Sequence, residues 1–207
     1  MLNKPYFITL EGVEGAGKSS AIKFIEEYLN QRDISYITTR EPGGTKIAEE
    51  IRGILLAHHK EKMASSTEVL LAFAGRAQHL DVVIKPALAK GQWVICDRFT
   101  DASYAYQGAG RKMPAKWIEI LENWVQGDLR PDLTIIMDLD PQVGLERAKK
   151  CSDPDRFEVE DAEFFQRVRQ CYLDRAQQYP KRYAVVNAEQ SIVEVETAIK
   201  EILDTIK

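Results

Sequence analysis

The residues with the clearest chemical potential are a glycine-rich run and a lysine-serine pair near the N-terminus. Residues 12–19 read Gly-Val-Glu-Gly-Ala-Gly-Lys-Ser and match the pattern G-x-x-x-x-G-K-[ST]. An apolar run at 6–10 precedes them, and Ile22, Ile25 and Leu29 follow at helical spacing. This is the strand-loop-helix context of a phosphate-binding loop. Glycines let amide N–H groups turn inward, and the start of the next helix favours an anion.

The pattern predicts a role for each part of this loop. Lys18 is expected to reach the β- and γ-phosphates of a nucleoside triphosphate, and the Ser19 hydroxyl to ligand Mg²⁺. A glycine-rich turn that binds no nucleotide is the alternative, which the flanking strand and helix disfavour. The loop does not say where the phosphoryl group goes. The expected ATP-binding residues are Gly12, Val13, Glu14, Gly15, Ala16, Gly17, Lys18, Ser19 and Ser20.

Two arginines follow other predicted strands. Arg40 comes directly after the run 36–39, and Arg98 comes two residues after the run 93–96. Ligands of parallel α/β sheets bind at the carboxyl ends of the strands, so we expect both arginines near the loop. A guanidinium matches phosphate geometry, which favours a second anion. Alternatively, each arginine forms an edge ion pair with its chain neighbour, Glu41 or Asp97.

Asp97 closes an apolar strand, the placement expected of a carboxylate that holds Mg²⁺ or its waters. A capping aspartate is the alternative. A phosphate acceptor is largely dianionic near neutral pH and is already a nucleophile, so catalysis would reduce to positioning and charge neutralisation. A hydroxyl acceptor would call for a carboxylate base, which Glu14, Glu41 or Asp97 could supply. The residues alone leave this choice open.

Strands alternate with helices along the whole chain. Most of the strand candidates are short apolar runs without alternation, as expected for a parallel sheet covered on both faces. We therefore predict a three-layer α/β fold, a five-stranded parallel sheet with helices on both faces, in a single domain over 1–207. The predicted strands are Phe7–Leu10, Tyr36–Thr39, Trp93–Cys96, Leu133–Leu139 and Tyr183–Val186.

Capping patterns predict where several helices begin. Ser65-x-x-Glu68 is expected to open a long helical segment to about Lys90, and Ser191-x-x-Glu194 the last helix. Pro114 suits the first turn of a helix to about Gln126. In the last helix a buried stripe is predicted, formed by Ile192, Val195, Ile199 and Ile202.

Composition narrows the class of protein. The 207 residues are 44% hydrophobic and 29% charged with a net charge of −4, which argues against a nucleic-acid-coating surface. The three cysteines have no metal or disulfide spacing, and Cys96 reads as a core residue. His58, His59 and His79 read as surface or packing residues. No signal peptide or membrane-spanning run is recognisable, so a cytoplasmic location is expected.

Five further segments resemble bacterial thymidylate kinases, in that family's order and over nearly the whole chain. The resemblance implies the nucleoside monophosphate kinase fold, the reaction ATP + dTMP → ADP + dTDP with Mg²⁺, and a homodimer. The segments are Thr39-Arg-Glu-Pro-Gly-Gly-Thr45, Phe73-Ala-Gly-Arg-Ala-Gln78, Asp97-Arg-Phe99, Ala105-Tyr-Gln-Gly108 and Asp155-Arg-Phe-Glu158.

The resemblance also implies roles around the acceptor phosphate and sugar. It assigns Arg40 and Arg98 to the acceptor phosphate, in agreement with the charge argument. It places Glu14 at the deoxyribose 3′-hydroxyl, and Tyr106 against the sugar where a 2′-hydroxyl would clash.

For the base, the resemblance implies that Phe73 stacks on thymine and that Arg76 donates to a thymine carbonyl. Ser103 and Gln107 fall where the family contacts the base or its surroundings. Core packing is the alternative for Phe73 and Tyr106, as for most aromatic residues in helices.

Residues 147–158 are polar and basic, and the resemblance implies a lid that closes over ATP. The alternative is a solvated loop between helices that has no role in catalysis. Members of that family whose phosphate-binding loop contains no arginine place one in the lid, so the resemblance implies a lid arginine at the transferred phosphoryl group, with Arg156 preferred and Arg147 second. Lys149, Lys150 and Cys151 depart from the arginine-rich lids of many relatives.

Two other functions are considered. A deoxynucleoside or other small-molecule kinase acting on a hydroxyl would share the phosphate-binding loop. A GTPase-like switch would need N-K-x-D and D-x-x-G motifs, and neither occurs in the chain.

Overall fold

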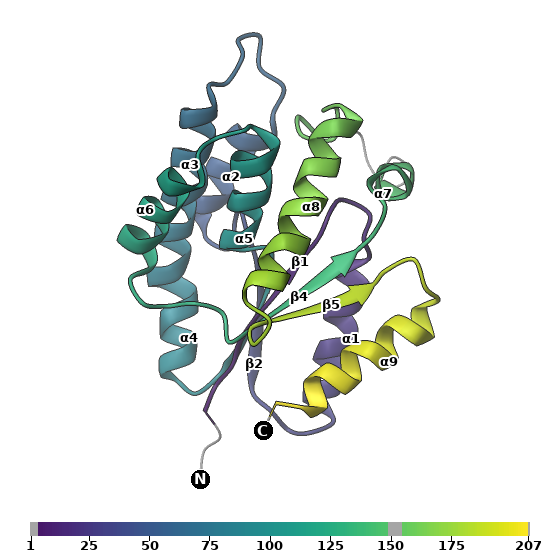
Figure 1. Cartoon of the computed structure of the whole chain (residues 1–207). Coiled ribbons are helices and arrows are strands. Elements are labelled where there is room, and N and C mark those ends of the chain that lie inside the picture. Colours follow the sequence, from purple (N-terminus) through teal and green to yellow (C-terminus); the bar gives the residue numbers. More distant parts are fainter. Residues whose placement is uncertain (1–3, 149–154, 207) are drawn as a thin grey trace.

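The computed structural model describes residues 4–148 and 155–206. Their strands form one parallel sheet in the order β2-β3-β1-β4-β5 (Figure 1). The predicted five-stranded parallel sheet is confirmed, and β1, which leads into the phosphate-binding loop, is its central strand. The strands are β1 Phe7–Glu11, β2 Tyr36–Arg40, β3 Trp93–Asp97, β4 Leu133–Asp138 and β5 Tyr183–Asn187.

Helices cover both faces of this sheet, which confirms the three-layer architecture. Helices α1 and α9 pack against each other on one face, and the segment that contains α4 lies on the other. The helices are α1 Lys18–Asn30, α2 Lys46–Leu56, α3 Ser65–His79, α4 Lys85–Ala89, α5 Thr100–Ser103, α6 Ala115–Gln126, α7 Pro141–Ala148, α8 Ala162–Gln178 and α9 Ile192–Asp204, with π-helical segments at Leu80–Ile84 and Tyr104–Gly110.

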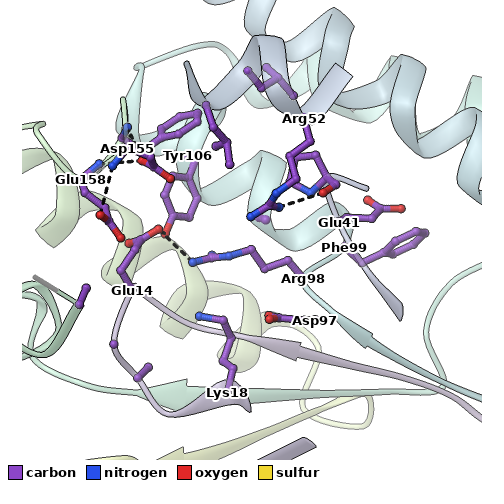
Figure 2. Close-up of a pocket in the computed structure, with 18 of the residues that line it drawn as sticks. Glu14, Lys18, Glu41, Arg52, Asp97, Arg98, Phe99, Tyr106, Asp155 and Glu158 are labelled. Carbon is purple, nitrogen blue, oxygen red and sulfur yellow. Dashed lines mark hydrogen bonds and ion pairs between the residues drawn. The ribbon is translucent and has the colours of Figure 1, made fainter. Parts of the chain in front are cut away.

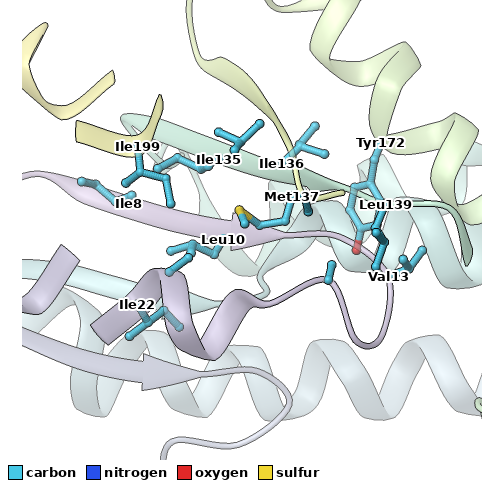
Figure 3. Close-up of a cluster of buried hydrophobic side chains, with 14 of the residues drawn as sticks. Ile8, Leu10, Val13, Ile22, Ile135, Ile136, Met137, Leu139, Tyr172 and Ile199 are labelled. Carbon is cyan, nitrogen blue, oxygen red and sulfur yellow. The ribbon is translucent and has the colours of Figure 1, made fainter. Parts of the chain in front are cut away.

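Strand β1 is buried along its whole length because its alternating side chains enter two different cores. Ile8 and Leu10 belong to a cluster that includes Ile22 of α1 and Ile199 of α9 (Figure 3). Phe7 belongs to a second cluster on the opposite face, with residues of the α3–α4 segment. The absence of polar alternation in the strand sequences follows from this two-sided burial.

Several strands extend one residue beyond their predicted apolar runs. Glu11, Arg40 and Asp97 are the last residues of β1, β2 and β3, and Asp97 pairs with both Leu10 and Arg40 across the sheet. Ladder hydrogen bonds join backbone groups, so a polar side chain does not end a strand. The three charged side chains are therefore held by the sheet at its carboxyl edge.

The helix predictions were right in extent and only partly right in detail. Ser191 and Glu194 form the predicted capping box. The Ser65 cap was wrong: Ala64 is the capping position, Ser65 is already helical, and the Glu68 side chain binds arginines instead. Pro114 lies one residue before its helix. Ile192, predicted in a buried stripe, is 69% exposed because it is the first residue of α9 and lies at the end of the packed face, whereas Ile199 is fully buried.

Other sequence expectations have clear outcomes. Cys96 is fully buried, as predicted, and His58 and His59 are exposed. Lys149, Lys150 and Cys151 lie outside the described residues, as does the rest of 149–154, which is half of the predicted lid 147–158. Within 4–148 and 155–206, every helix is too short or too polar to cross a membrane.

Candidate active site

The phosphate-binding loop connects β1 to α1 through glycines that no other residue could replace. Gly12 has a φ of 140°, and a Cβ there would lie 2.5 Å from the carbonyl oxygen of Met137. Gly15 has a φ of 69°, and its Cβ would lie 2.1 Å from the carbonyl oxygen of Gly144 in α7. The loop is therefore pressed against β4 and α7, with the first turn of α1 beginning at Lys18.

Lys18 is a buried cation at the centre of this loop. Its Nζ donates to the carbonyl oxygens of Gly12 (3.2 Å) and Val13 (3.0 Å). Burial and, after it, the positive charge of Arg98 together lower the pKa of Lys18 to about 8, while the negative charges of Asp97 and Glu14 oppose the shift. An anion bound here would favour the charged amine, which suits Lys18 to phosphate binding.

Arg98 is held in a strained conformation between the sheet and the loop. Its φ of 65° is left-handed, which costs about 1–3 kcal/mol for a residue with a side chain. Its Nη2 donates to Oε1 of Glu14 at 3.0 Å, and the hydroxyl of Tyr106 donates to the same oxygen at 2.6 Å (Figure 2). Its Nη1 donates to the hydroxyl of Tyr172 at 3.2 Å.

A cavity of about 490 Å³ opens between the phosphate-binding loop, the ends of β2 and β3, and the helices α2, α3 and α7. It has room for a nucleotide-sized ligand. The structure brings most of the predicted site residues to its wall. These are Glu14, Gly15, Ala16, Gly17, Lys18, Ser19, Ser20, Arg76, Asp97, Arg98, Ser103, Tyr106, Gln107 and Arg147.

Some predicted site residues do not line the cavity. Gly12 and Val13 lie behind the loop and offer their carbonyls to Lys18. The ring of Phe73 is buried in a cluster with Val69 and Ile118, which corresponds to the core-packing alternative. The guanidinium of Arg76 lies 4.5 Å from the Phe73 ring centroid, so this aromatic residue supports Arg76 from behind.

Arg40 is also outside the cavity. Its Nη2 binds Glu49 of α2 at 2.9 Å, and its side chain is half exposed. The alternative pairing with Glu41 does not occur either, because Glu41 turns inward to Arg76 and His79.

Arg156 and Arg147 occupy different environments. Arg156 donates to Glu68 (2.7 Å) and to the carbonyl of Leu55 (2.9 Å), and it does not line the cavity. Arg147, at the end of α7, does line the cavity, and its Nη1 lies 3.4 Å from the carbonyl of Ala188.

Arg52 is a cavity residue that sequence reasoning missed. It lies on α2, and its Nη1 donates to the carbonyl of Pro42 at 2.9 Å (Figure 2). Burial lowers the pKa of Arg52, and the positive charges of Arg40 and Arg98 lower it further. No motif marks this residue, because its position depends on how α2 packs over the Arg40–Gly44 turn. Lys18, Arg52 and Arg98 thus give the cavity several cations, an arrangement suited to more than one phosphate.

The far end of the cavity is built around Arg76. Its Nε donates to Glu41 (2.8 Å), Nη1 to Ser103 (3.1 Å) and Nη2 to the carbonyl of Phe99 (3.0 Å). Glu41 in turn contacts Nδ1 of His79 at 3.0 Å. His79 is therefore a packing residue, as predicted, within a buried polar network that fixes the orientation of Arg76.

The residues expected to hold Mg²⁺ have free ligand atoms. Oδ1 of Asp97 is buried without a hydrogen-bond partner among the described residues, and Ser19 is exposed on the cavity wall. The described ranges contain no cluster of three or more metal-binding side chains. One carboxylate and one hydroxyl fit Mg²⁺ that is carried by phosphates, rather than an ion held by protein ligands alone.

A central β1, a phosphate-binding loop and a second group of cations beside it define a nucleotide kinase of the P-loop class. Comparison with known sequences narrows this class. The family model for thymidylate kinase matches residues 10–199, and the chain therefore belongs to the thymidylate kinase family.

Similar proteins support this assignment over almost the full length. A thymidylate kinase of Teredinibacter turnerae is 54% identical over 198 residues, which cover 96% of this chain and 97% of that protein. A thymidylate kinase of Neisseria gonorrhoeae is 50% identical over 201 residues, 97% of each chain. The crystal structure of thymidylate kinase from Ehrlichia chaffeensis has a TM-score of 0.77 and 32% identity, covering 97% of this chain and 98% of that one. The resemblance noted in the sequence is confirmed.

Proposed function

We propose that this chain transfers the γ-phosphoryl group of ATP to the phosphate of dTMP, giving ADP and dTDP. The observation that carries the proposal is one cavity that joins the phosphate-binding loop to Arg98, Arg52 and Arg76. The first part of the cavity suits a triphosphate, the arginines suit a second phosphate, and membership of the family identifies the nucleotides.

The chemistry needs positioning and charge neutralisation rather than a base. An oxygen of the dTMP phosphate forms a bond to the γ-phosphorus while the bond from that phosphorus to the β,γ-bridging oxygen breaks, and ADP leaves with that oxygen. Lys18 and Arg98 share the negative charge that spreads over the transferred group. For the remaining cation we favour Arg147, because it lines the cavity and Arg156 does not.

The acceptor is held by residues at the carboxyl edge of the sheet. Arg98 and Arg52 bind the dTMP phosphate in this proposal, and Glu14 with Tyr106 receives the deoxyribose. Arg76, Ser103 and Gln107 face the base. Phe73 acts through Arg76 rather than by direct stacking, since its ring lies in the buried cluster and the guanidinium lies over it. Arg40 contributes to acceptor binding indirectly in this proposal, through its ion pair with Glu49.

Mg²⁺ is the expected cofactor, and Ser19 with Asp97 would hold it together with the phosphates of ATP. When bound, Mg²⁺ would neutralise part of the negative charge of the ATP phosphates. The free Asp97 carboxylate oxygen supports this assignment.

The chain is also proposed to act as a single-domain, cytoplasmic homodimer. Trp117, Ile120 and Trp124 are exposed at i, i+3 and i+7 on α6, and Leu70 on the adjacent α3 is also exposed. Such an apolar stripe suits a protein interface. With a net charge of −4, no nucleic-acid partner is proposed.

The direct test compares dTMP and thymidine as acceptors with ATP and Mg²⁺. Turnover of dTMP and not thymidine is expected. Turnover of thymidine alone would instead support the hydroxyl-kinase alternative, in which Glu14 or Asp97 acts as a base. As a second step, Arg98→Ala should raise the KM for dTMP and lower kcat together, whereas wild-type kinetics would refute the role of Arg98.

A further inference from the structure

The carboxylate of Glu11 and the hydroxyl of Tyr172 are buried polar groups that the proposed reaction does not use. Glu11 is 0% exposed at the end of β1, and Tyr172 is 1% exposed in α8. Neither residue lines the cavity. Burying a carboxyl group costs free energy unless hydrogen bonds compensate for the lost contact with water. The partners of these two buried groups therefore indicate what the pair does.

Glu11 holds the backbone on the C-terminal side of Arg98. Its Oε1 accepts a hydrogen bond from the amide of Phe99 at 2.7 Å. The amide of Arg98 itself donates to the carbonyl of Leu10 at 2.8 Å. Two consecutive residues of β1 therefore fix the two amides around the residue with the left-handed φ of 65°. A strained conformation of this kind persists only where its surroundings hold it.

Tyr172 holds the other end of the same arginine. Its hydroxyl interacts with Oε2 of Glu11 at 2.9 Å and accepts from Nη1 of Arg98 at 3.2 Å. The opposite nitrogen, Nη2, donates to Glu14. The Arg98 guanidinium is thus supported by α8 on one side and by the phosphate-binding loop on the other. Glu11 is linked to the backbone next to Arg98 through the Phe99 amide, and to the Arg98 side chain through Tyr172.

We propose that Glu11 and Tyr172 are positioning residues that hold Arg98 in the orientation that binds the acceptor phosphate. The proposal rests on the proposed function, because it takes dTMP as the ligand of Arg98. A guanidinium that is already fixed loses little conformational freedom when the phosphate binds. Glu11 and Tyr172 should therefore increase the affinity for the phosphate group of dTMP and not the affinity for the nucleoside.

The experiment measures the affinity of each variant for dTMP and for thymidine by calorimetry. Tyr172→Phe keeps the buried ring and removes only the hydroxyl, so it carries the test. We expect about tenfold weaker dTMP binding, the scale of one hydrogen bond to a charged group, and unchanged thymidine binding. Tyr28→Phe is the matched control, since Tyr28 is also buried but binds Asp204, away from the cavity.

Substitutions of Glu11 give a second, independent reading. Glu11→Ala should weaken dTMP binding at least as much as Tyr172→Phe, because it frees both the Phe99 amide and the Tyr172 hydroxyl. Glu11→Gln should restore affinity to within about twofold, since an amide of equal length offers an acceptor to Phe99 and a donor to Tyr172. The double variant Tyr172→Phe with Arg98→Ala should bind no more weakly than Arg98→Ala alone.

Three outcomes would each overturn the positioning role. The first is an equal loss of dTMP and thymidine affinity, and the second is an additive effect of Tyr172→Phe and Arg98→Ala. The third is unchanged dTMP affinity in Tyr172→Phe. These outcomes are separable from failure of the proposed function. If wild type does not phosphorylate dTMP, the function itself is wrong; if it does while Tyr172→Phe binds normally, only the positioning role is wrong.

Discussion

At the scale of single residues, arginines with similar sequence contexts have different surroundings. Arg40 and Arg98 both lie at the carboxyl ends of strands, yet Arg40 pairs with Glu49 in solvent while Arg98 spans the cavity. Arg52 carries no sequence signal and lines the cavity beside Arg98. An exposed ion pair contributes little, whereas a partly buried cation beside another cation gains strongly from an anion.

The first prediction compares Arg52→Ala with Arg40→Ala. Arg52→Ala should raise the KM for dTMP about tenfold or more, because it removes the proposed charge-assisted contact to the acceptor phosphate. Arg40→Ala should raise the KM less than about threefold, since the Arg40 side chain binds Glu49 and does not line the cavity. Steady-state kinetics at saturating ATP measures both values. A larger effect of Arg40→Ala would show that Arg40 reaches the phosphate directly.

At the scale of elements, α7 and the phosphate-binding loop meet backbone to backbone. A Cβ on Gly144 would lie 2.3 Å from the carbonyl oxygen of Glu14, and one on Gly15 would meet Gly144 in return. Each element therefore limits the position of the other. Because Arg147 follows Gly144 by less than one turn of α7, this contact also sets where that arginine lies relative to the loop.

The second prediction is that Gly144→Ala impairs ATP binding. The added methyl group must displace the Glu14 carbonyl, so the KM for ATP should rise about tenfold or more and stability should fall by about 1–3 kcal/mol. Kinetics and urea unfolding measure the two effects. Gly53→Ala is the matched control, because Gly53 is also helical and a Cβ there meets nothing within 4 Å. Normal ATP kinetics in Gly144→Ala would show that the loop can yield at this contact.

At the scale of the whole molecule, an ionisable group that is buried beside the site makes the stability of the fold depend on pH. Burial and, to a smaller extent, the negative charge of Asp101 together raise the pKa of Glu11 from 4.5 to about 8, although the positive charge of Arg98 opposes the shift. The folded protein therefore keeps a proton on Glu11 between about pH 4.5 and 8 that the unfolded chain loses. This contribution to stability is complete below pH 4.5 and declines as pH rises through that window.

The third prediction follows from this linkage. The free energy of unfolding of wild type should fall relative to Glu11→Gln as pH rises from 5.5 to 7.5, by about 2 kcal/mol, since one pKa unit corresponds to about 1.4 kcal/mol. Urea unfolding of both proteins at the two pH values measures the difference, and other titrating groups cancel between them. A constant difference would mean that Glu11 titrates normally in the fold.

The fourth prediction concerns assembly. Trp124→Glu should convert the proposed homodimer to a monomer at micromolar concentration, because it places a charge in the apolar stripe of α6, where Trp124 is 80% exposed. Val193→Glu is the control, since Val193 is 69% exposed on the distant helix α9. Sedimentation velocity distinguishes the two states. A monomeric wild type would contradict the proposed homodimer. A Trp124→Glu variant that is still dimeric would show that the interface does not include this part of α6.

The sequence by itself determined the sheet, the order of its helices, and the phosphate-binding loop. These features depend on local patterns: apolar runs for strands buried on both faces, capping residues for helices, and glycines where a Cβ would collide with Met137 or Gly144. The family resemblance added the acceptor and several residues of the cavity wall, among them Arg76, Ser103 and Tyr106. One local pattern misled: Ser65-x-x-Glu68 matches a capping box, but the Glu68 side chain forms tertiary ion pairs with Arg111 and Arg156.

Only the tertiary structure decided which charges meet. Arg52 enters the cavity, Arg156 turns to Glu68, and Glu11 reaches Tyr172 across 161 positions of the chain. The physical reason is that a charged side chain takes the partner that relieves its burial, and that partner comes from whichever element packs nearby. No spacing in the sequence encodes such a pairing, because it exists only once the helices lie on the sheet.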